Sequence, residues 1–320
     1  MVADPDDIAQ AVTRLAAGGL VAFVTETVYG LGADAFNADA VKEVFKLKAR
    51  ATTNPLIVHV TGPKMASRVV ADWPQIADVL AAAFWPGPLT LVLPKARNIP
   101  DIVTAGGPTV AVRCPDHPTA LALIEAFDGP LVGPSANVSG QISPTTAEHV
   151  RASFRDEDLL VLDGGPCRGG IESTVLLLAG GVARILRPGL IGADEIRDVL
   201  GQEVNVVEGA SESAVVQSPG LIGRHYSPRT AMVLFRACDW PGVLERGGRV
   251  VVLTHELRDV GRPHVLIAMP RDAEGYAARL YAALREADEM GADLIAVEEP
   301  GSGGVWLAVL DRLGRAAERK

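Results

Sequence analysis

Helical and strand-like patterns alternate through roughly the first 200 residues of the chain, and this alternation constrains the fold more than any other feature. An amphipathic helical run over 6–17 precedes a buried strand pattern over 20–24. A second helical run over 73–84 stops at Pro86-Gly87-Pro88, before a strand pattern over 89–93. Further strand patterns cover 110–113, 159–162 and 173–178, and a closing helix covers 193–200. The alternation predicts an α/β domain with a mixed or mostly parallel sheet.

The pattern loosens after residue 200, where 210–230 is rich in Ser, Gly and Pro. This stretch carries Arg224, His225 and Tyr226 together, so we expect it to pack against another surface rather than only to separate two domains. A second α/β pattern follows, with strands over 232–235, 249–253 and 294–297 and a helix over 273–287. We therefore expect a first α/β domain over 1–205, a linker over 206–230 and a smaller Rossmann-like domain over 231–320.

The amino-acid composition limits the number of domains, the cysteine chemistry and the cellular location that the chain can have. The 320 residues are 48% hydrophobic, which is enough for two domains with buried cores. The three cysteines are odd in number and widely separated, so neither a disulfide framework nor a cysteine-rich metal site is indicated. The N-terminus has no secretory pattern, and no apolar run approaches the roughly 20 residues of a membrane span. We expect a cytoplasmic protein that does not bind membranes.

The net charge of −9 bears on possible partners, because proteins that hold nucleic acid usually present a basic surface. A tight general RNA binder is therefore disfavoured. A local cluster of arginines would serve a small anionic ligand equally well.

Two polar clusters stand at the ends of apolar runs in the first half of the chain. Lys48 and Arg50 follow a helical pattern and lead to Asn54, whereas Ser135 and Asn137 follow a strand-like pattern. Together they offer cations, amides and hydroxyls where chain ends meet solvent. This combination is typical of a site for a phosphorylated ligand.

These residues belong to a longer series of motifs that resembles the YrdC/Sua-type threonylcarbamoyl-AMP synthases, in their two-domain branch. The resemblance extends over essentially the whole chain. The motifs are Thr25-Glu26-Thr27-Val28-Tyr29-Gly30-Leu31-Gly32, Lys48-x-Arg50, Asn54-Pro55-Leu56-Ile57-Val58-His59, Phe84-Trp85-Pro86-Gly87-Pro88-Leu89-Thr90, Ser135-Ala136-Asn137, Glu172-Ser173-Thr174, Leu186-Arg187-Pro188-Gly189 and His225-Tyr226-Ser227-Pro228.

The resemblance implies that L-threonine, bicarbonate or CO₂, and ATP are converted to threonylcarbamoyl-AMP and pyrophosphate. The product would pass to downstream threonylcarbamoyl transferase proteins that modify tRNA next to the anticodon, and contact of this chain with tRNA would be weak or indirect at most. Mg²⁺ would be bound mainly through the ATP phosphates, with no metal site built from protein ligands. The fold implied is a twisted open sheet with a concave cleft, followed by the smaller domain.

The resemblance also implies residue roles. Lys48 and Arg50 would be catalytic, and residues 206–230 would close over the nucleotide as a lid. The threonine pocket would comprise Thr25, His59, Arg113, Ser135 and Ser173. The ATP contacts would fall on Lys48, Arg50, Asn54, Thr109, Asn137, Ser143, Arg187 and Tyr226.

Other interpretations remain open from the residues alone. Taken singly, Arg113 is more often a salt-bridged residue than a ligand clamp, His59 a hydrogen-bonded core histidine, and Ser135 a turn residue. Two competing functions are a non-catalytic module that binds double-stranded RNA or tRNA, and a carbamoyltransferase relative that uses carbamoyl phosphate. The chain also departs from the family pattern at Ala49, where glycine or asparagine is typical.

Overall fold

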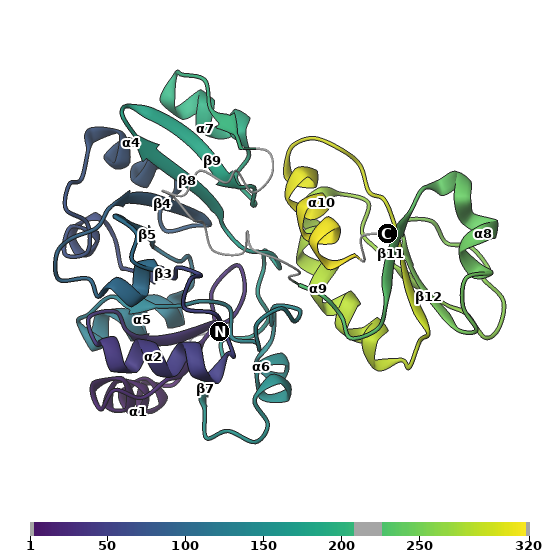
Figure 1. Ribbon diagram of the computed structural model, residues 1–320, viewed down its shortest axis with the longest axis horizontal. Coiled ribbons are helices and arrows are strands. Elements are labelled where there is room, and N and C mark those ends of the chain that lie inside the picture. Colours follow the sequence, from purple (N-terminus) through teal and green to yellow (C-terminus); the bar gives the residue numbers. More distant parts are fainter. Residues whose placement is uncertain (1–2, 208–225, 318–320) are drawn as a thin grey trace.

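A computed structural model describes residues 3–207 and 226–317. These residues form two α/β domains, coloured purple to teal and green to yellow in Figure 1. The helices of the first domain are α1 (Pro5–Ala16), α2 (Ala38–Leu47), α3 (Pro63–Ala66), α4 (Gln75–Phe84), α5 (Pro118–Phe127), α6 (Ala147–Ser153) and α7 (Ala193–Leu200), with the 3₁₀ turn η1 (Asp101–Thr104).

A ten-stranded open sheet forms the centre of the first domain, with the strand order β10-β9-β8-β4-β5-β3-β6-β2-β1-β7. Its pairs are mixed: β4 and β8 are parallel, for example, whereas β8 and β9 are antiparallel. The strands are β1 (Val21–Phe23), β2 (Gly30–Asp34), β3 (Ile57–His59), β4 (Leu89–Pro94), β5 (Thr109–Arg113), β6 (Leu131–Val132), β7 (Leu160–Leu162), β8 (Thr174–Ala179), β9 (Val182–Arg187) and β10 (Asn205–Val206).

Local sequence signals explain where the first helices begin. The side chain of Asp4 caps α1 by accepting a hydrogen bond from the Asp6 amide, and Pro5 occupies the first helical position. Asn37 caps α2 by accepting from the amides of Asp39 and Ala40. Each helix turns an apolar stripe toward the sheet, where it joins the main core of the domain. The end of α2 therefore has a fixed position, from which the segment with Lys48 and Arg50 departs.

The second domain is a four-stranded parallel sheet with the order β11-β14-β12-β13. Figure 1 shows α9 and α10 on the side that faces the first domain and α8 on the far side. The elements are β11 (Met232–Phe235), η2 (Ala237–Asp239), α8 (Trp240–Leu244), β12 (Val250–Thr254), β13 (Val265–Ala268), α9 (Ala273–Glu289), β14 (Leu294–Glu298) and α10 (Val305–Ala316).

The two domains share one buried apolar cluster. Val28, Ile142 and Ile171 of the first domain pack with the core of the second domain around α9. At Gly170, which has a φ of +72°, an added Cβ would come within 2.4 Å of the Ala277 carbonyl oxygen, so the backbones of the two domains approach closely there. The first domain is therefore packed against α9 at Gly170, two residues before Glu172.

The expected α/β architecture is confirmed, and of the two expected sheet types the mixed one is observed. The finer Rossmann-like description and the boundaries 1–205, 206–230 and 231–320 stay predictions. Most of the expected lid, residues 208–225, lies outside the described residues. None of the helices within 3–207 and 226–317 is long and apolar enough to cross a membrane.

Candidate active site

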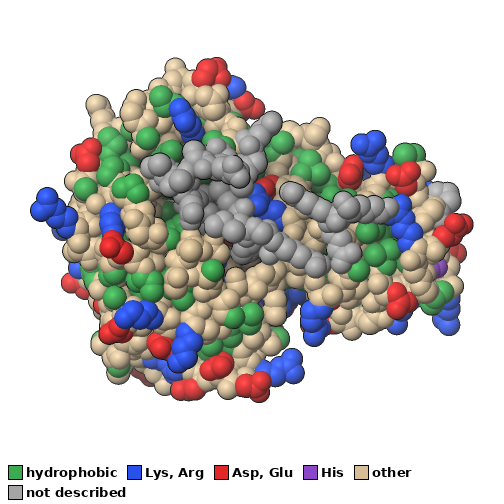
Figure 2. Space-filling view, in the orientation of Figure 1, with side chains coloured by type: hydrophobic (Ala, Val, Ile, Leu, Met, Phe, Trp, Pro, Cys, Tyr) green, Lys and Arg blue, Asp and Glu red, His purple; other side chains and the backbone are tan. Residues whose placement is uncertain are grey.

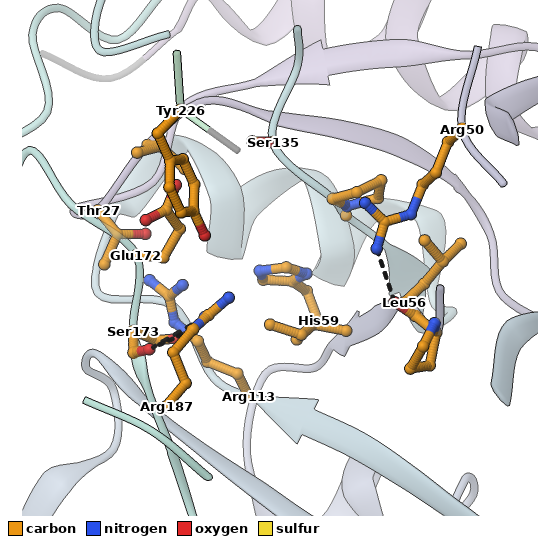
Figure 3. A pocket seen from close by; sticks show the side chains of 15 residues that line it. Thr27, Arg50, Leu56, His59, Arg113, Ser135, Glu172, Ser173, Arg187 and Tyr226 are labelled. Atoms are coloured by element: carbon orange, nitrogen blue, oxygen red, sulfur yellow. Dashed lines mark hydrogen bonds between the residues drawn. The ribbon is translucent and has the colours of Figure 1, made fainter. Parts of the chain in front are cut away.

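A cavity lies at one edge of the first sheet, where several strand ends meet. His59 and Arg113 end β3 and β5, Arg187 ends β9, and Ser173 directly precedes β8. Figure 3 shows these side chains around the same space. The lining residues are Thr27, Val28, Arg50, Pro55, Leu56, Ile57, His59, Arg113, Gly133, Pro134, Ser135, Glu172, Ser173, Arg187 and Tyr226.

Strand register brings His59 and Arg113 together, because they are direct partners in the parallel pair β3–β5. The His59 ring meets Phe23 edge-on, with 5.6 Å between ring centroids. Burial, and secondarily the charge of Arg113, lower the pKa of His59 to about 3. The imidazole is therefore neutral near pH 7, so it offers one donor and one acceptor but no charge.

Arg113 is buried and already has an acidic partner. Its Nη2 lies 2.6 Å from Glu26 Oε2 in an ion pair, and its Nε donates to the Gly87 carbonyl at 3.3 Å. Glu26 belongs to the loop after β1, so the pair joins that loop to the end of β5. A ligand carboxylate would meet a guanidinium that Glu26 already holds in place.

Arg50 reaches the cavity from the segment after α2. Its Nε and Nη2 donate to the carbonyls of Asn54 and Pro55 at 3.3 and 3.1 Å. Burial lowers the pKa of Arg50 to about 10, the nearby Tyr226 acts in the opposite direction, and the charge of Arg187 lowers it further. The guanidinium remains charged at neutral pH, with further N–H groups on its fork to bind an anion.

Lys48 has a different position from Arg50. Its Nζ donates to the carbonyl of Asn137 at 2.6 Å and also to that of Ser135, so it ties the loop after β6 to the end of α2. Burial, and then the charge of Arg50, lower the pKa of Lys48 well below its usual range. Next to it, Ala49 has a φ of +48°, which explains why glycine or asparagine is favoured at this position.

Arg187 and Ser173 are coupled on the opposite wall. Arg187 donates from Nε and Nη2 to the Ser173 carbonyl at 3.2 and 3.0 Å, and from Nη2 to Ser173 Oγ at 3.2 Å. The Ser173 hydroxyl also contacts the Thr90 hydroxyl at 2.8 Å. Burial, as the largest cause, lowers the pKa of Arg187. The contacts fix the guanidinium at the cavity wall.

Six of the expected site residues do not line the cavity. Thr25 is buried and its hydroxyl donates to the Val28 carbonyl at 2.6 Å, which shapes the loop from which Thr27 reaches the cavity. Thr109 lies at the other end of β5 from Arg113. The remaining four are Lys48, Asn54, Asn137 and Ser143. Roles for these six as direct ligands stay predictions.

Sequence reasoning assigned no role to three residues with polar side chains that the structure places at or beside the cavity: Thr27, Glu26 and Glu172. All three belong to the quoted motifs. Glu172 accepts hydrogen bonds from Ser143 Oγ at 2.7 Å and from Tyr281 and Arg312 of the second domain. Polarity within a motif was the available signal, but only the fold shows which partners these carboxylates have.

The cavity is suited to an anion. Arg50, Arg113 and Arg187 line it; among the described residues one carboxylate, that of Glu172, lines it with them, and Glu26 pairs with Arg113 beside it. Elsewhere, basic and acidic side chains are interspersed on the face seen in Figure 2. Within the described ranges no three His, Cys, Asp or Glu side chains gather as a metal site. The arrangement defines a protein that binds a small anionic ligand at strand ends.

Comparison with known proteins gives the family. Residues 13–189 match the Sua5, YciO and YrdC family, described as "Telomere recombination", and residues 191–318 match "Threonylcarbamoyl-AMP synthase, C-terminal domain". The threonylcarbamoyl-AMP synthase of Bacillus subtilis is 42% identical, over 98% of this chain and 93% of its own. That of Pyrococcus abyssi is 38% identical, over 94% of this chain and 91% of its own.

A solved structure agrees with these matches. The crystal structure of P. abyssi Sua5 complexed with L-threonine superposes with a TM-score of 0.88 at 36% identity, and covers 97% of this chain and 94% of that chain. The chain belongs to the threonylcarbamoyl-AMP synthase family.

Proposed function

We propose that this protein forms threonylcarbamoyl-AMP from L-threonine, bicarbonate or CO₂, and ATP, with release of pyrophosphate, as the first step of threonylcarbamoyladenosine modification of tRNA. The observation that carries the proposal is the meeting of Arg50, Arg113 and Arg187 with the neutral His59 in one cavity. A triphosphate and an amino acid carboxylate both need such fixed positive charge.

L-threonine would occupy the part of the cavity near His59 and Arg113. The P. abyssi relative solved with L-threonine supports this substrate. Arg113 would bind the carboxylate, and its ion pair with Glu26 at 2.6 Å holds the guanidinium in position. Neutral His59, with the hydroxyls of Ser135 and Ser173, would bind the amine and the side-chain oxygen. Thr25 would act by shaping the loop that carries Thr27.

ATP would be held between Arg50 and Arg187, with the ring of Tyr226 at the cavity wall. Lys48 would fix the loop 135–137, and its expected catalytic and ATP-binding role stays a prediction. Asn54 and Asn137 each have a buried amide oxygen without a hydrogen-bond partner among the described residues, and a ligand donor would satisfy it. Roles in ATP binding for Ser143 and Thr109 are supported by the family motifs alone.

Mg²⁺ would enter with the ATP phosphates. The two carboxylates at the cavity do not make a metal cage, since Glu26 is paired with Arg113 and Glu172 with Arg312. Phosphate oxygens and water would supply most of the ligands, as is usual for this ion.

The reaction depends on positioning and charge neutralisation. The neutral amine of threonine captures CO₂ to give a carbamate, with loss of one proton. A carbamate oxygen then attacks the α-phosphorus, the bond to the β-phosphate oxygen breaks, and pyrophosphate leaves. Arg50 and Arg187 would neutralise the charge that develops on the phosphates. We also propose a cytoplasmic location and downstream transferase partners, whereas the expected lid over 206–230 lies mostly outside the described residues.

The test is pyrophosphate release by the purified protein with ATP, Mg²⁺ and bicarbonate. L-threonine should stimulate release well above the rates without an amino acid or with L-serine. Arg50→Ala should lower kcat/KM by about 100-fold or more, because a charge-assisted contact to the phosphates is lost. Lys48→Ala should lower it by a similar factor, because the loop 135–137 loses its anchor.

Absence of threonine-dependent release from folded wild-type protein would contradict the proposal. Salt-sensitive tRNA binding without turnover would then favour the RNA-binding alternative, and turnover of carbamoyl phosphate would favour the carbamoyltransferase alternative.

A further inference from the structure

The Glu172 carboxylate is held mainly by the second domain. Its Oε1 accepts from Ser143 of the first domain at 2.7 Å. Its Oε2 accepts from the Tyr281 hydroxyl of α9 and from Arg312 Nε of α10, both at 2.9 Å. Glu172 lines the cavity, whereas Tyr281 and Arg312 do not. These two residues therefore affect the site indirectly, through their contacts with Glu172.

Arg312 is fully buried, which makes its charge an unusual feature of a domain interface. Besides Glu172, its Nη1 pairs with Asp311 at 2.7 Å, and its guanidinium lies 5.5 Å from the Tyr226 ring centroid. Burial alone would lower the pKa of Arg312, but Tyr226, Glu172 and Asp311 raise it well above its usual range. The guanidinium is therefore a permanent cation that contacts Glu172 from outside the cavity.

Tyr281 also contacts Tyr226, which lies within the linker. Its ring stacks on Tyr226 with 5.7 Å between centroids and 23° between planes. Tyr226 has a φ of +63°, which is uncommon for a bulky residue and shows that the surrounding packing holds it in place. Tyr281 and Arg312 thus contact both Glu172 and Tyr226, two lining residues of the cavity.

An unpaired carboxylate here would oppose anion binding. Glu172 and Arg187 interact electrostatically, so without Arg312 the carboxylate would compete with the nucleotide phosphates for Arg187 and would repel them. Burial would raise the pKa of Glu172, but Arg312, Arg187 and the hydrogen bonds lower it overall, so the carboxylate is ionised at neutral pH. Some group must neutralise it.

We propose that Arg312 and Tyr281 are positioning residues for nucleotide binding, and that the second domain thereby completes the active site by neutralising and orienting Glu172. The inference rests on the proposed function, which it deepens by giving the second domain a role at the phosphate site. The second domain would not take part in the chemical step itself.

The experiment measures the Kd of a non-hydrolysable ATP analogue with Mg²⁺ for the full-length protein and its variants, together with threonine-dependent pyrophosphate release. Arg312→Gln should weaken binding about tenfold or more, because Glu172 loses its counter-charge. Arg312→Lys should retain part of the affinity. The double variant Glu172→Gln/Arg312→Gln should recover most of it, because the uncompensated charge is gone.

Tyr281→Phe is the second test, since it removes one hydroxyl and keeps the stacked ring. It should weaken binding about threefold. Tyr276→Phe is the matched control: Tyr276 is buried on the same helix, and its hydroxyl has no hydrogen-bond partner among the described residues. It should leave the Kd unchanged. If Arg312→Gln fails to fold, this pair of variants decides the question.

The outcomes separate the inference from the proposed function. If Arg312→Gln and Tyr281→Phe bind the analogue as wild type does, or if the double variant binds no better than Arg312→Gln, the second domain acts only in docking and the inference is wrong. Wild-type protein that binds the analogue but shows no threonine-dependent release contradicts the proposed function alone. Wild-type protein that binds no nucleotide contradicts both.

Discussion

At the scale of single residues, the threonine end of the cavity depends on close packing around His59. The ring contacts Phe23 and lies directly against Gly133 of the loop after β6. A Cβ at Gly133 would be 2.6 Å from His59 Nδ1, which is closer than van der Waals contact allows. Glycine is required there because the backbone forms the surface against which the imidazole is held.

Gly133→Ala should therefore displace the His59 ring. We expect the KM for L-threonine to rise about tenfold or more, because displacement of a binding group by a fraction of an ångström is costly. The KM for ATP should change less, since Arg50 and Arg187 lie on other segments. Steady-state pyrophosphate release at varied threonine is the measurement, and an unchanged KM would show that His59 does not bind this substrate.

At the scale of elements, α10 meets three environments: the core of the second domain, the interface with the first domain, and solvent. Ala308, Val309 and Leu313 pack into the second-domain core, and Arg312 enters the interface with the first domain. Gly314 lies on the exposed face, and a Cβ there would have no heavy atom within 4 Å. The helix thus carries a residue of poor helix propensity at a position where packing does not require it.

Gly314→Ala should raise the free energy of unfolding by about 0.5–1 kcal/mol, because alanine loses less backbone entropy than glycine in a helix. Urea denaturation of both proteins is the measurement. The variant should keep wild-type turnover, which makes it a matched glycine-to-alanine control for Gly133→Ala. A loss of stability would mean that this position is more crowded than the structure indicates.

At the scale of the whole molecule, buried titratable groups make stability depend on pH. Burial lowers the pKa of His59 to about 3 and that of His149 to about 4, against an ordinary value of about 6.5 in the unfolded chain. Below pH 6.5 the unfolded chain therefore binds protons that the folded chain does not. Stability is retained above this pH and falls as the pH decreases toward these folded pKa values.

We expect His59 alone to contribute a slope of up to about 1.4 kcal/mol per pH unit in this window. In His59→Gln the free energy of unfolding should consequently decrease less steeply between pH 6.5 and 4.5 than in wild type. Denaturant unfolding at several pH values measures both slopes. Equal slopes would show that the His59 imidazole is protonated in the folded protein.

The sequence by itself determined the α/β class, two domains, most of the regular elements and the family, because these depend on local periodicity, turn residues and motif order. The helix over 193–200, for example, is α7 with the same bounds. The sequence also suggested that Lys48 and Arg50 together form a phosphate site. In the structure the two side chains have different positions: Arg50 lines the cavity, whereas Lys48 binds the loop 135–137.

Only the tertiary structure decided which carboxylates belong to the site and what holds them. The Glu26–Arg113 ion pair joins the loop after β1 to the end of β5, and the Glu172–Arg312 pair joins the two domains across 140 positions of sequence. Local patterns report burial and secondary structure, whereas the partner of a buried charge depends on sheet register and domain packing. For that reason the sequence motifs indicated the substrates, whereas the fold was needed to show how the second domain contacts the active site.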